Sequence, residues 1–173
     1  MSATVLERAT TSGTAWTGRV FVPIRTLPAA PVVRKKNAIG QSRGGRTSKI
    51  HARVDALGHL LALVITAGHV HDSQAAPSLL QGARTDAFVM DKAYDENEIR
   101  QLAASLGATA VVPPRSNRKP QIPYDKHLYK ERHAVENFFQ RIKRYRKIAT
   151  RYAKRVETFR GAVYLVAIVD WLR

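Results

Sequence analysis

The sequence contains no cysteine, few acidic residues and no long apolar run. Without cysteine, the protein has no disulfide, no thiolate-bound zinc and no thiol nucleophile. The longest mostly apolar runs, residues 60–67 and 162–169, are much shorter than the roughly 20 residues that span a bilayer. The first residues lack the apolar stretch of a secretion signal. These absences predict a cytoplasmic protein without a membrane partner, in a compartment that contains DNA or RNA.

The shortage of acids leaves a large positive charge. Twenty-nine Lys and Arg residues face 13 Asp and Glu residues, which gives a net charge of +16, and no Asp precedes Asp55. Such an excess predicts a polyanionic partner, and nucleic acid is the first candidate. The chain of 173 residues, 45% of them hydrophobic, is nevertheless long enough and apolar enough to bury a core.

The hydrophobic pattern predicts an α/β fold with a mixed sheet and flanking helices. Residues 1–34 form an atypical N-terminal segment, with one short strand at 19–24 that Pro23 restricts to an edge. The remaining residues, 35–173, are expected to form one domain. Its expected elements are strands at 50–55, 60–66, 87–90 and 108–112, and helices at 72–83, 97–105, 126–147 and 156–172. The first two strands read as a hairpin, and Asp72 and Asp125 are the expected N-caps of their helices.

Two acids stand out by their positions. Asp91 directly follows the strand 87–90, and the carboxyl ends of strands are where ligands bind in α/β sheets. Glu136 lies in the long helix with Tyr129, Arg132 and Lys143, at spacings of three, four and seven residues that place all four on one helical stripe. A carboxylate flanked by cations fits a Mg²⁺ site beside DNA phosphates. The alternatives are that Asp91 only caps a turn and that Arg132 and Glu136 form an ordinary surface pair.

The charge density around Glu136 favours nucleic acid. Residues 115–155 contain 14 Lys and Arg against three acids, so this region repels itself unless a polyanion binds. Aromatic residues alternate with these cations and could stack on bases or pack on sugars. Besides Arg132 and Lys143, the candidate DNA contacts are Arg141, Arg144, Arg146 and Lys147.

Several segments in the same order resemble DDE transposases of bacterial insertion sequences, in the branch often called the insertion-sequence-five family. The stripe of Tyr129, Arg132, Glu136 and Lys143 matches the Y-R-E-K signature of that family. The other matching segments are residues 40–59, 65–76, 90–100, 111–119 and 130–152. The resemblance covers roughly residues 35–173.

The resemblance implies an RNase H-like fold in which three carboxylates hold two Mg²⁺ (or Mn²⁺) ions for DNA cleavage and strand transfer. Asp91 corresponds to the second Asp and Glu136 to the Glu of that triad, and both would bind metal. Arg132 and Lys143 would contact phosphates, and Tyr129 would position the DNA end. The implied partner is double-stranded DNA, both transposon ends and target, bound by a homo-oligomer. The implied location is the bacterial cytoplasm, in association with the nucleoid.

The sequence departs from this family upstream of residue 40. The first Asp of the triad belongs on the first strand, and no Asp occurs there, so the domain is expected to be incomplete and inactive alone. Ala93 also replaces a usual Gly. Three readings follow: a transposase portion, either a remnant or one frame of a split gene; a non-catalytic regulator that binds transposon ends; or a nonspecific basic protein.

Overall fold

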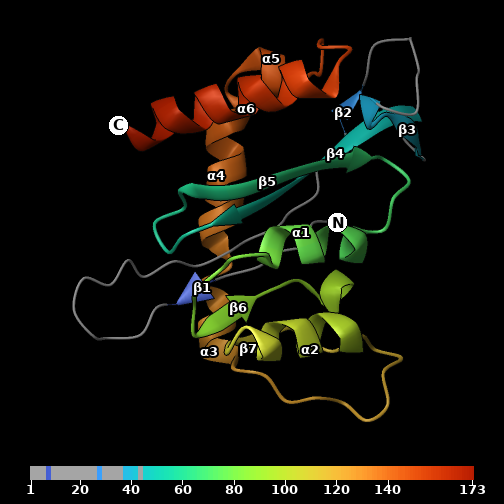
Figure 1. Cartoon of the computed structure of the whole chain (residues 1–173), viewed down its shortest axis with the longest axis vertical. Helices are drawn as coiled ribbons and strands as arrows, with labels where there is room; N and C mark the ends of the chain where they lie inside the picture. Colours follow the sequence, from blue (N-terminus) through green and yellow to red (C-terminus); the bar gives the residue numbers. More distant parts are fainter. Residues whose placement is uncertain (1–6, 9–26, 29–36, 43–44) are drawn as a thin grey trace.

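The computed structural model describes residues 7–8, 27–28, 37–42 and 45–173 (Figure 1). The strands are β1 (Glu7–Arg8), β2 (Leu27–Pro28), β3 (Gly40–Ser42), β4 (Gly45–Val54), β5 (Leu60–Ala67), β6 (Ala87–Val89) and β7 (Thr109–Val111). The helices are α1 (Ala76–Leu80), α2 (Asn97–Ser105), α3 (Lys126–Lys130), α4 (His133–Lys143), α5 (Arg146–Ala149) and α6 (Val156–Trp171), with 3₁₀ turns η2 (Asp72–Ala75) and η3 (Lys92–Tyr94). The strand expected at 19–24, like most of the segment 1–34, lies outside the described residues. The α/β class is confirmed.

The predicted hairpin is present as β4 and β5, which pair antiparallel from Ser48 opposite Ala67 to Val54 opposite Leu60. Asp55 organises the turn, since its Oδ1 accepts the amides of Leu57 and His59 at 2.9 and 2.8 Å. These bonds give Asp55 a structural role in the turn. One face of the hairpin packs on the C-terminal helices and the other on α1 (Figure 1).

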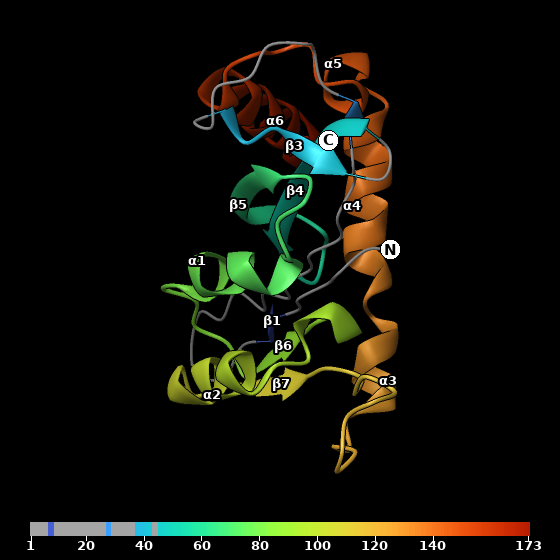
Figure 2. The same cartoon turned by 90° about the vertical axis from the view of Figure 1, so that its right-hand side faces the viewer.

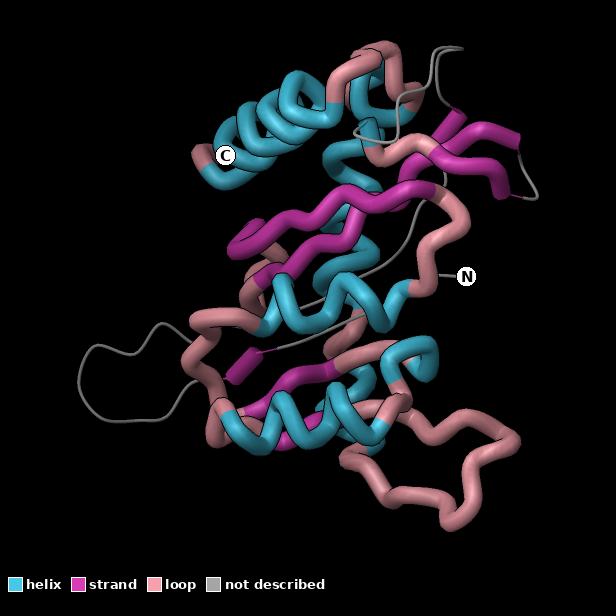
Figure 3. The backbone as a smooth tube through the Cα atoms, turned by 45° about the vertical axis from the view of Figure 1, so that its right-hand side comes forward, coloured by secondary structure: helices cyan, strands magenta, loops and turns pink. Residues whose placement is uncertain are grey.

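β2 and β3 pair antiparallel with β4 and complete the sheet of the hairpin. The other three strands form a second sheet in the order β1-β6-β7, below α1 in Figure 3. β6 is fully buried and pairs parallel to β7, so the carboxyl ends of both strands lie at one edge. The sequence predicted one mixed sheet. Among the described residues, however, no strand pairs with both β4 and β6, so two sheets form instead.

The helix expected at 126–147 is interrupted twice, giving α3, α4 and α5. Asp125 does cap its start, accepting the amides of His127 and Leu128. Figure 2 shows α4 running along one side of the molecule, from α3 at one end to α5 at the other. Its buried residues are Ala134, Val135, Phe138, Phe139 and Ile142.

The helix expected to begin at Asp72 also differs. It starts as the turn η2 and continues as the short α1, and the N-cap is His71, whose side chain accepts the Ser73 amide. Asp72 has another partner, Lys49, at 2.9 Å. That ion pair ties the middle of β4 to the start of η2, so Asp72 bonds to a neighbouring strand and not to its own helix end.

Among the described residues, Arg151 is the largest fully buried side chain, and it joins the last third of the chain to β4 and the residues just before β3. Its guanidinium donates to the carbonyls of Asn37 (2.7 Å) and Ala38 (3.2 Å) and to the Ser48 hydroxyl. It also lies 5.0 Å from the centre of the Phe159 ring. Burial lowers the pKa of Arg151, while Glu157 opposes that shift. These acceptors are neutral, so they replace the water lost on burial without neutralising the charge.

Replacing Arg151 with Ala should therefore destabilise the fold by about 2–4 kcal/mol, because it leaves buried carbonyls unpaired and opens a cavity. Urea denaturation monitored by circular dichroism measures this loss. The control is Arg155→Ala at an exposed position, which should change stability by less than about 0.5 kcal/mol. Equal effects of the two variants would show that Arg151 does not fasten the two regions.

Candidate functional site

A cleft of about 700 Å³ lies at the carboxyl ends of β6 and β7. Parallel pairing brings the chain segments that follow both strands to this edge. The residues that line the cleft are His71, Asp72, Asp91, Lys92, Ala93, Pro114, Arg115, Ser116 and Asn117. The cleft thus combines two carboxylates with the cationic side chains of Lys92 and Arg115.

Asp91 follows β6 and begins the turn η3, where its backbone carbonyl accepts the Tyr94 amide at 2.9 Å. Its side chain does not cap that turn. Burial raises the pKa of Asp91, and the charge of Asp72 adds to this, while Arg132 and Lys92 lower it. The net shift is upward, so the ionised carboxylate is held at a cost in free energy. Such an arrangement is typical of an acid that serves a ligand and not the fold.

Glu136 lies in the first turn of α4, half-exposed, and forms an ion pair with Arg132. The Arg132 guanidinium lies 5.8 Å from the centre of the Tyr129 ring, and its charge also reaches Asp91. Burial, with smaller effects of Asp91 and Glu136, raises the pKa of Tyr129 to about 12 despite Arg132. Asp91, Tyr129, Arg132 and Glu136 therefore share one electrostatic neighbourhood, although they come from two distant parts of the sequence.

The helical stripe is thus only partly preserved. The break before α4 makes Arg132 the residue that precedes the helix, yet its contacts with Tyr129 and Glu136 persist. Lys143 is the last residue of α4, seven positions after Glu136 and so about 10 Å farther along the axis. Any DNA contact of Lys143 would be at a separate phosphate.

The donor chemistry of the site fits a hard divalent cation, since Asp91 and Glu136 offer carboxylate oxygens. Asp72 is nearby but is held by Lys49, whose Nζ also donates to the Val70 carbonyl at 2.7 Å. Within residues 37–42 and 45–173, and the two short strands before them, no cluster of three or more His, Asp or Glu residues is positioned for a metal. The described residues therefore do not bring three acids together, and of Asp91 and Glu136 only Asp91 lines the cleft.

The expected DNA-contacting cations divide into two groups. Arg144, Arg146 and Lys147 are exposed where α4 ends and α5 begins. Arg141 instead donates from Nε to both carboxylate oxygens of Asp170 (2.8 and 2.9 Å) and from Nη2 to the Gly58 carbonyl (2.9 Å). These bonds join α4 to α6 and to the hairpin turn, which favours a structural role for Arg141.

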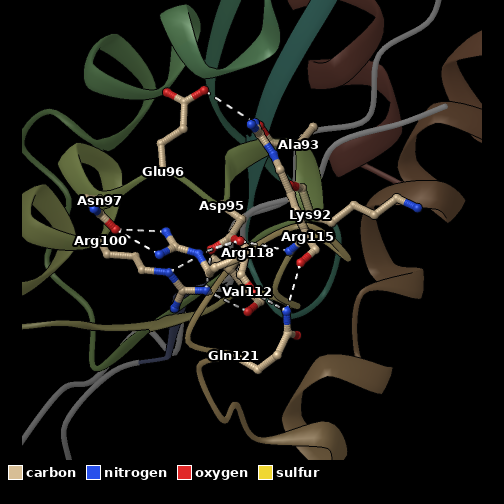
Figure 4. Close-up of polar contacts among 10 residues, drawn as sticks. All are labelled: Lys92, Ala93, Asp95, Glu96, Asn97, Arg100, Val112, Arg115, Arg118 and Gln121. Atoms are coloured by element: carbon tan, nitrogen blue, oxygen red, sulfur yellow. Dashed lines mark hydrogen bonds and ion pairs between the residues drawn. The ribbon is translucent and has the colours of Figure 1, made fainter.

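The loop after β7 is the part of the cleft that sequence reasoning missed. Pro114, Arg115 and Asn117 line the cleft together with Lys92. Arg115 and Arg118 bond to the segment that follows Asp91 (Figure 4). The rule that identified Asp91, namely that ligands bind at carboxyl ends of strands, applies equally to β7. It would have identified this loop had it been applied to both strands.

Comparisons with known proteins agree with the expected family. The model of the family described as Transposase DDE domain matches residues 21–171. A Brucella ovis protein named as the putative transposase for insertion sequence element IS6501 is 43% identical over 129 residues, which cover 73% of this chain and 99% of that protein. No solved structure gives a significant match. No helix among the described residues is long and apolar enough to cross a membrane.

The raised pKa of Asp91 predicts how the stability of the protein changes with pH. The folded protein binds this proton more tightly than the unfolded chain does, so the stabilisation that it provides is present at low pH and is lost as pH rises through the folded-state pKa. The Asn side chain of the Asp91→Asn variant does not ionise, so the variant does not lose stability in this way as pH rises. We expect the variant to be more stable than the wild type at pH 7, with a difference that shrinks toward pH 4. Urea denaturation at both pH values measures it.

The matched control is Glu98→Gln on the exposed face of α2, for which no such pH-dependent gain is expected. If Asp91→Asn destabilises the protein at pH 7, Asp91 contributes to folding, and its assignment to a ligand site loses this support.

Proposed function

The chain belongs to the Transposase DDE domain family, whose work is DNA transposition, and from this premise we propose that the cleft is its DNA-cleavage site. Asp91 and Glu136 would together hold Mg²⁺ or Mn²⁺ between η3 and α4. The strongest support is the position of Arg132. Its charge acts on both Asp91 and Glu136, although these two acids are 45 positions apart in the sequence. The chemistry that such a cation supplies is polarisation of a phosphodiester and activation of water or a 3′-hydroxyl for attack.

The protein's own residues would prepare this site in two steps. In the free protein, Arg132 neutralises Glu136, which prevents repulsion between Glu136 and the other acids of the site. When Glu136 takes up a cation, Arg132 would turn to a DNA phosphate, for which its planar guanidinium is suited. Tyr129, packed under Arg132, would contact the sugar or base at the transposon end.

Duplex DNA would continue from the cleft along α4 toward Lys143 and the exposed residues Arg144, Arg146 and Lys147. We expect both transposon ends and target DNA to use this surface, and a homo-oligomer to hold paired ends. For the fold, we propose that residues 35–173 form an RNase H-like domain in which β4–β5 and β6–β7 are the two parts of one ancestral sheet.

A second function, that of a non-catalytic protein that binds transposon ends, is favoured by the small number of acids that are available to the proposed site. Asp55 bonds to His59, and Asp72 forms an ion pair with Lys49. The first 54 residues contain a single acid, Glu7. Loss of one carboxylate ligand of a catalytic centre would lower the cleavage rate by roughly 10²–10³, which corresponds to a few kcal/mol. A chain with two acids could therefore bind DNA and cleave it very slowly.

Cleavage and its dependence on the two acids are tested with a labelled duplex taken from the ends of the element that carries the gene, in buffer with Mn²⁺. Asp91→Asn and Glu136→Gln should each abolish whatever nicking the wild type shows, while binding in a gel-shift assay stays within about threefold. Nicking that both variants retain would show that the site is misassigned. Specific binding without nicking in the wild type would establish the second function.

The DNA surface is tested by the salt dependence of binding to the same duplex. Arg146→Ala and Lys147→Ala should each weaken binding and reduce the slope of log K against log salt by about one, because each removes one phosphate contact. Arg141→Ala should leave the slope unchanged if the residue binds only Asp170 and Gly58. A slope that is unaffected by the first two variants would place the DNA elsewhere.

A further inference from the structure

Asp95 lies four residues after Asp91 but has a different environment, because its carboxylate is completely buried. Arg100 donates to Oδ1 from Nε and Nη2 at 3.0 and 2.8 Å. Arg118 Nε and the Arg115 amide donate to Oδ2 at 2.7 and 2.8 Å. Burial alone would raise the pKa of Asp95, but these hydrogen bonds from Arg115, Arg100 and Arg118 lower it overall. The carboxylate is thus ionised, and it accepts four hydrogen bonds from the protein's own donors.

The arginines that hold Asp95 connect three separate segments of the chain (Figure 4). Arg100 comes from α2 and also donates to the Val112 carbonyl at the end of β7 (2.9 Å). Arg118 also donates to the side chain of Asn97, at the start of α2. The Asp95 clamp, meaning Asp95 with Arg100, Arg115 and Arg118, therefore fixes the loop after β7 against the segment after β6.

Arg115 extends this clamp to the residues next to Asp91. Its guanidinium donates to the carbonyls of Lys92 (3.2 Å) and Ala93 (2.8 Å), which immediately follow Asp91, and to Glu96 Oε1 (3.3 Å). Glu96 also lies 3.7 Å from His71 Nδ1, so the same group reaches another wall of the cleft. Although Arg115 lines the cleft, its Nε and Nη2 donate to the protein's own backbone and to Glu96.

We propose that Arg115, anchored through Asp95, is a positioning residue that sets the orientation of the Asp91 carboxylate in the cleft. The segment from Asp91 to Tyr94 is one short 3₁₀ turn, which on its own has few hydrogen bonds to resist rotation. Holding the carbonyls of Lys92 and Ala93 fixes the peptide planes beside Asp91. Groups that orient a ligand in this way typically change metal affinity by 10–100-fold when they are removed.

This inference rests on the proposed function, because it assumes that Asp91 binds a divalent cation. The test measures Mn²⁺ binding by electron paramagnetic resonance for the full chain and its variants. The central variants are Arg115→Ala and Arg115→Lys. The matched control is Arg84→Ala, an exposed arginine outside the clamp and the cleft. Asp91→Asn tests the proposed function itself.

We expect Arg115→Ala to weaken Mn²⁺ binding about tenfold or more, and Arg115→Lys to weaken it less, since lysine can still donate to one carbonyl. Arg84→Ala should match the wild type. If Asp91→Asn weakens Mn²⁺ binding but Arg115→Ala does not, the positioning role is wrong and the proposed function stands. If Asp91→Asn has no effect, or the wild type binds no Mn²⁺, the proposed function fails first.

Hydrogen exchange separates positioning from general loss of structure. In Arg115→Ala, the amides of Tyr94 and Asp95, which close the turn after Asp91, should exchange faster, while those of the β4–β5 ladder should not change. Faster exchange across both sheets would show that Arg115 merely supports the fold and would overturn the proposal. Asp95→Asn should have the same local effect on exchange at Tyr94. The amide that replaces the carboxylate has only one acceptor oxygen, so some of the arginine donors lose their partner.

Discussion

The packing of α4 against the β4–β5 hairpin is the contact on which the rest of the molecule depends. Phe138, Phe139 and Ile142 are buried on one face of this helix, in the same core cluster as Ile50, Ala52 and Val54 of β4. Because side chains on a helix are fixed relative to one another, burying this face leaves Glu136 on the other one. A single apolar face thereby determines both the core and the direction of one acid of the site. The Arg141–Asp170 pair then holds α6 against the same helix.

The second constraint is the parallel pairing of β6 and β7. It places Asp91 and the loop that begins at Pro113 at one edge, and the Asp95 clamp fixes their spacing. The two acids of the candidate site are therefore positioned by different hydrophobic clusters. Glu136 depends on the cluster around the hairpin, and Asp91 depends on the cluster formed by β6, α1 and α2. Arg132 connects them electrostatically.

The cationic residues of this protein include two groups with different surroundings. Arg100, Arg118, Arg141 and Arg151 bond to internal acceptors and serve the fold, whereas Arg144, Arg146 and Lys147 are exposed. Net charge correctly indicated a nucleic-acid partner, but it could not show which arginines bond to internal acceptors and which are exposed. Arginine is suited to the internal use because its fork of donors satisfies several carbonyls at once.

The sequence alone determined the local elements and the family. Alternating and helical periodicities located the hairpin, the helix 97–105 and the last helix, since these patterns depend on neighbours a few residues away. The motifs around Asp91 and Glu136 identified the family, although their roles in cleavage are still proposals. Only the tertiary structure decided where the long helix breaks, that Asp72 pairs with Lys49, that Asp95 is enclosed by arginines, and that the strands form two sheets. Each of these depends on contacts between residues far apart in the chain, and such contacts leave no periodic trace in the sequence.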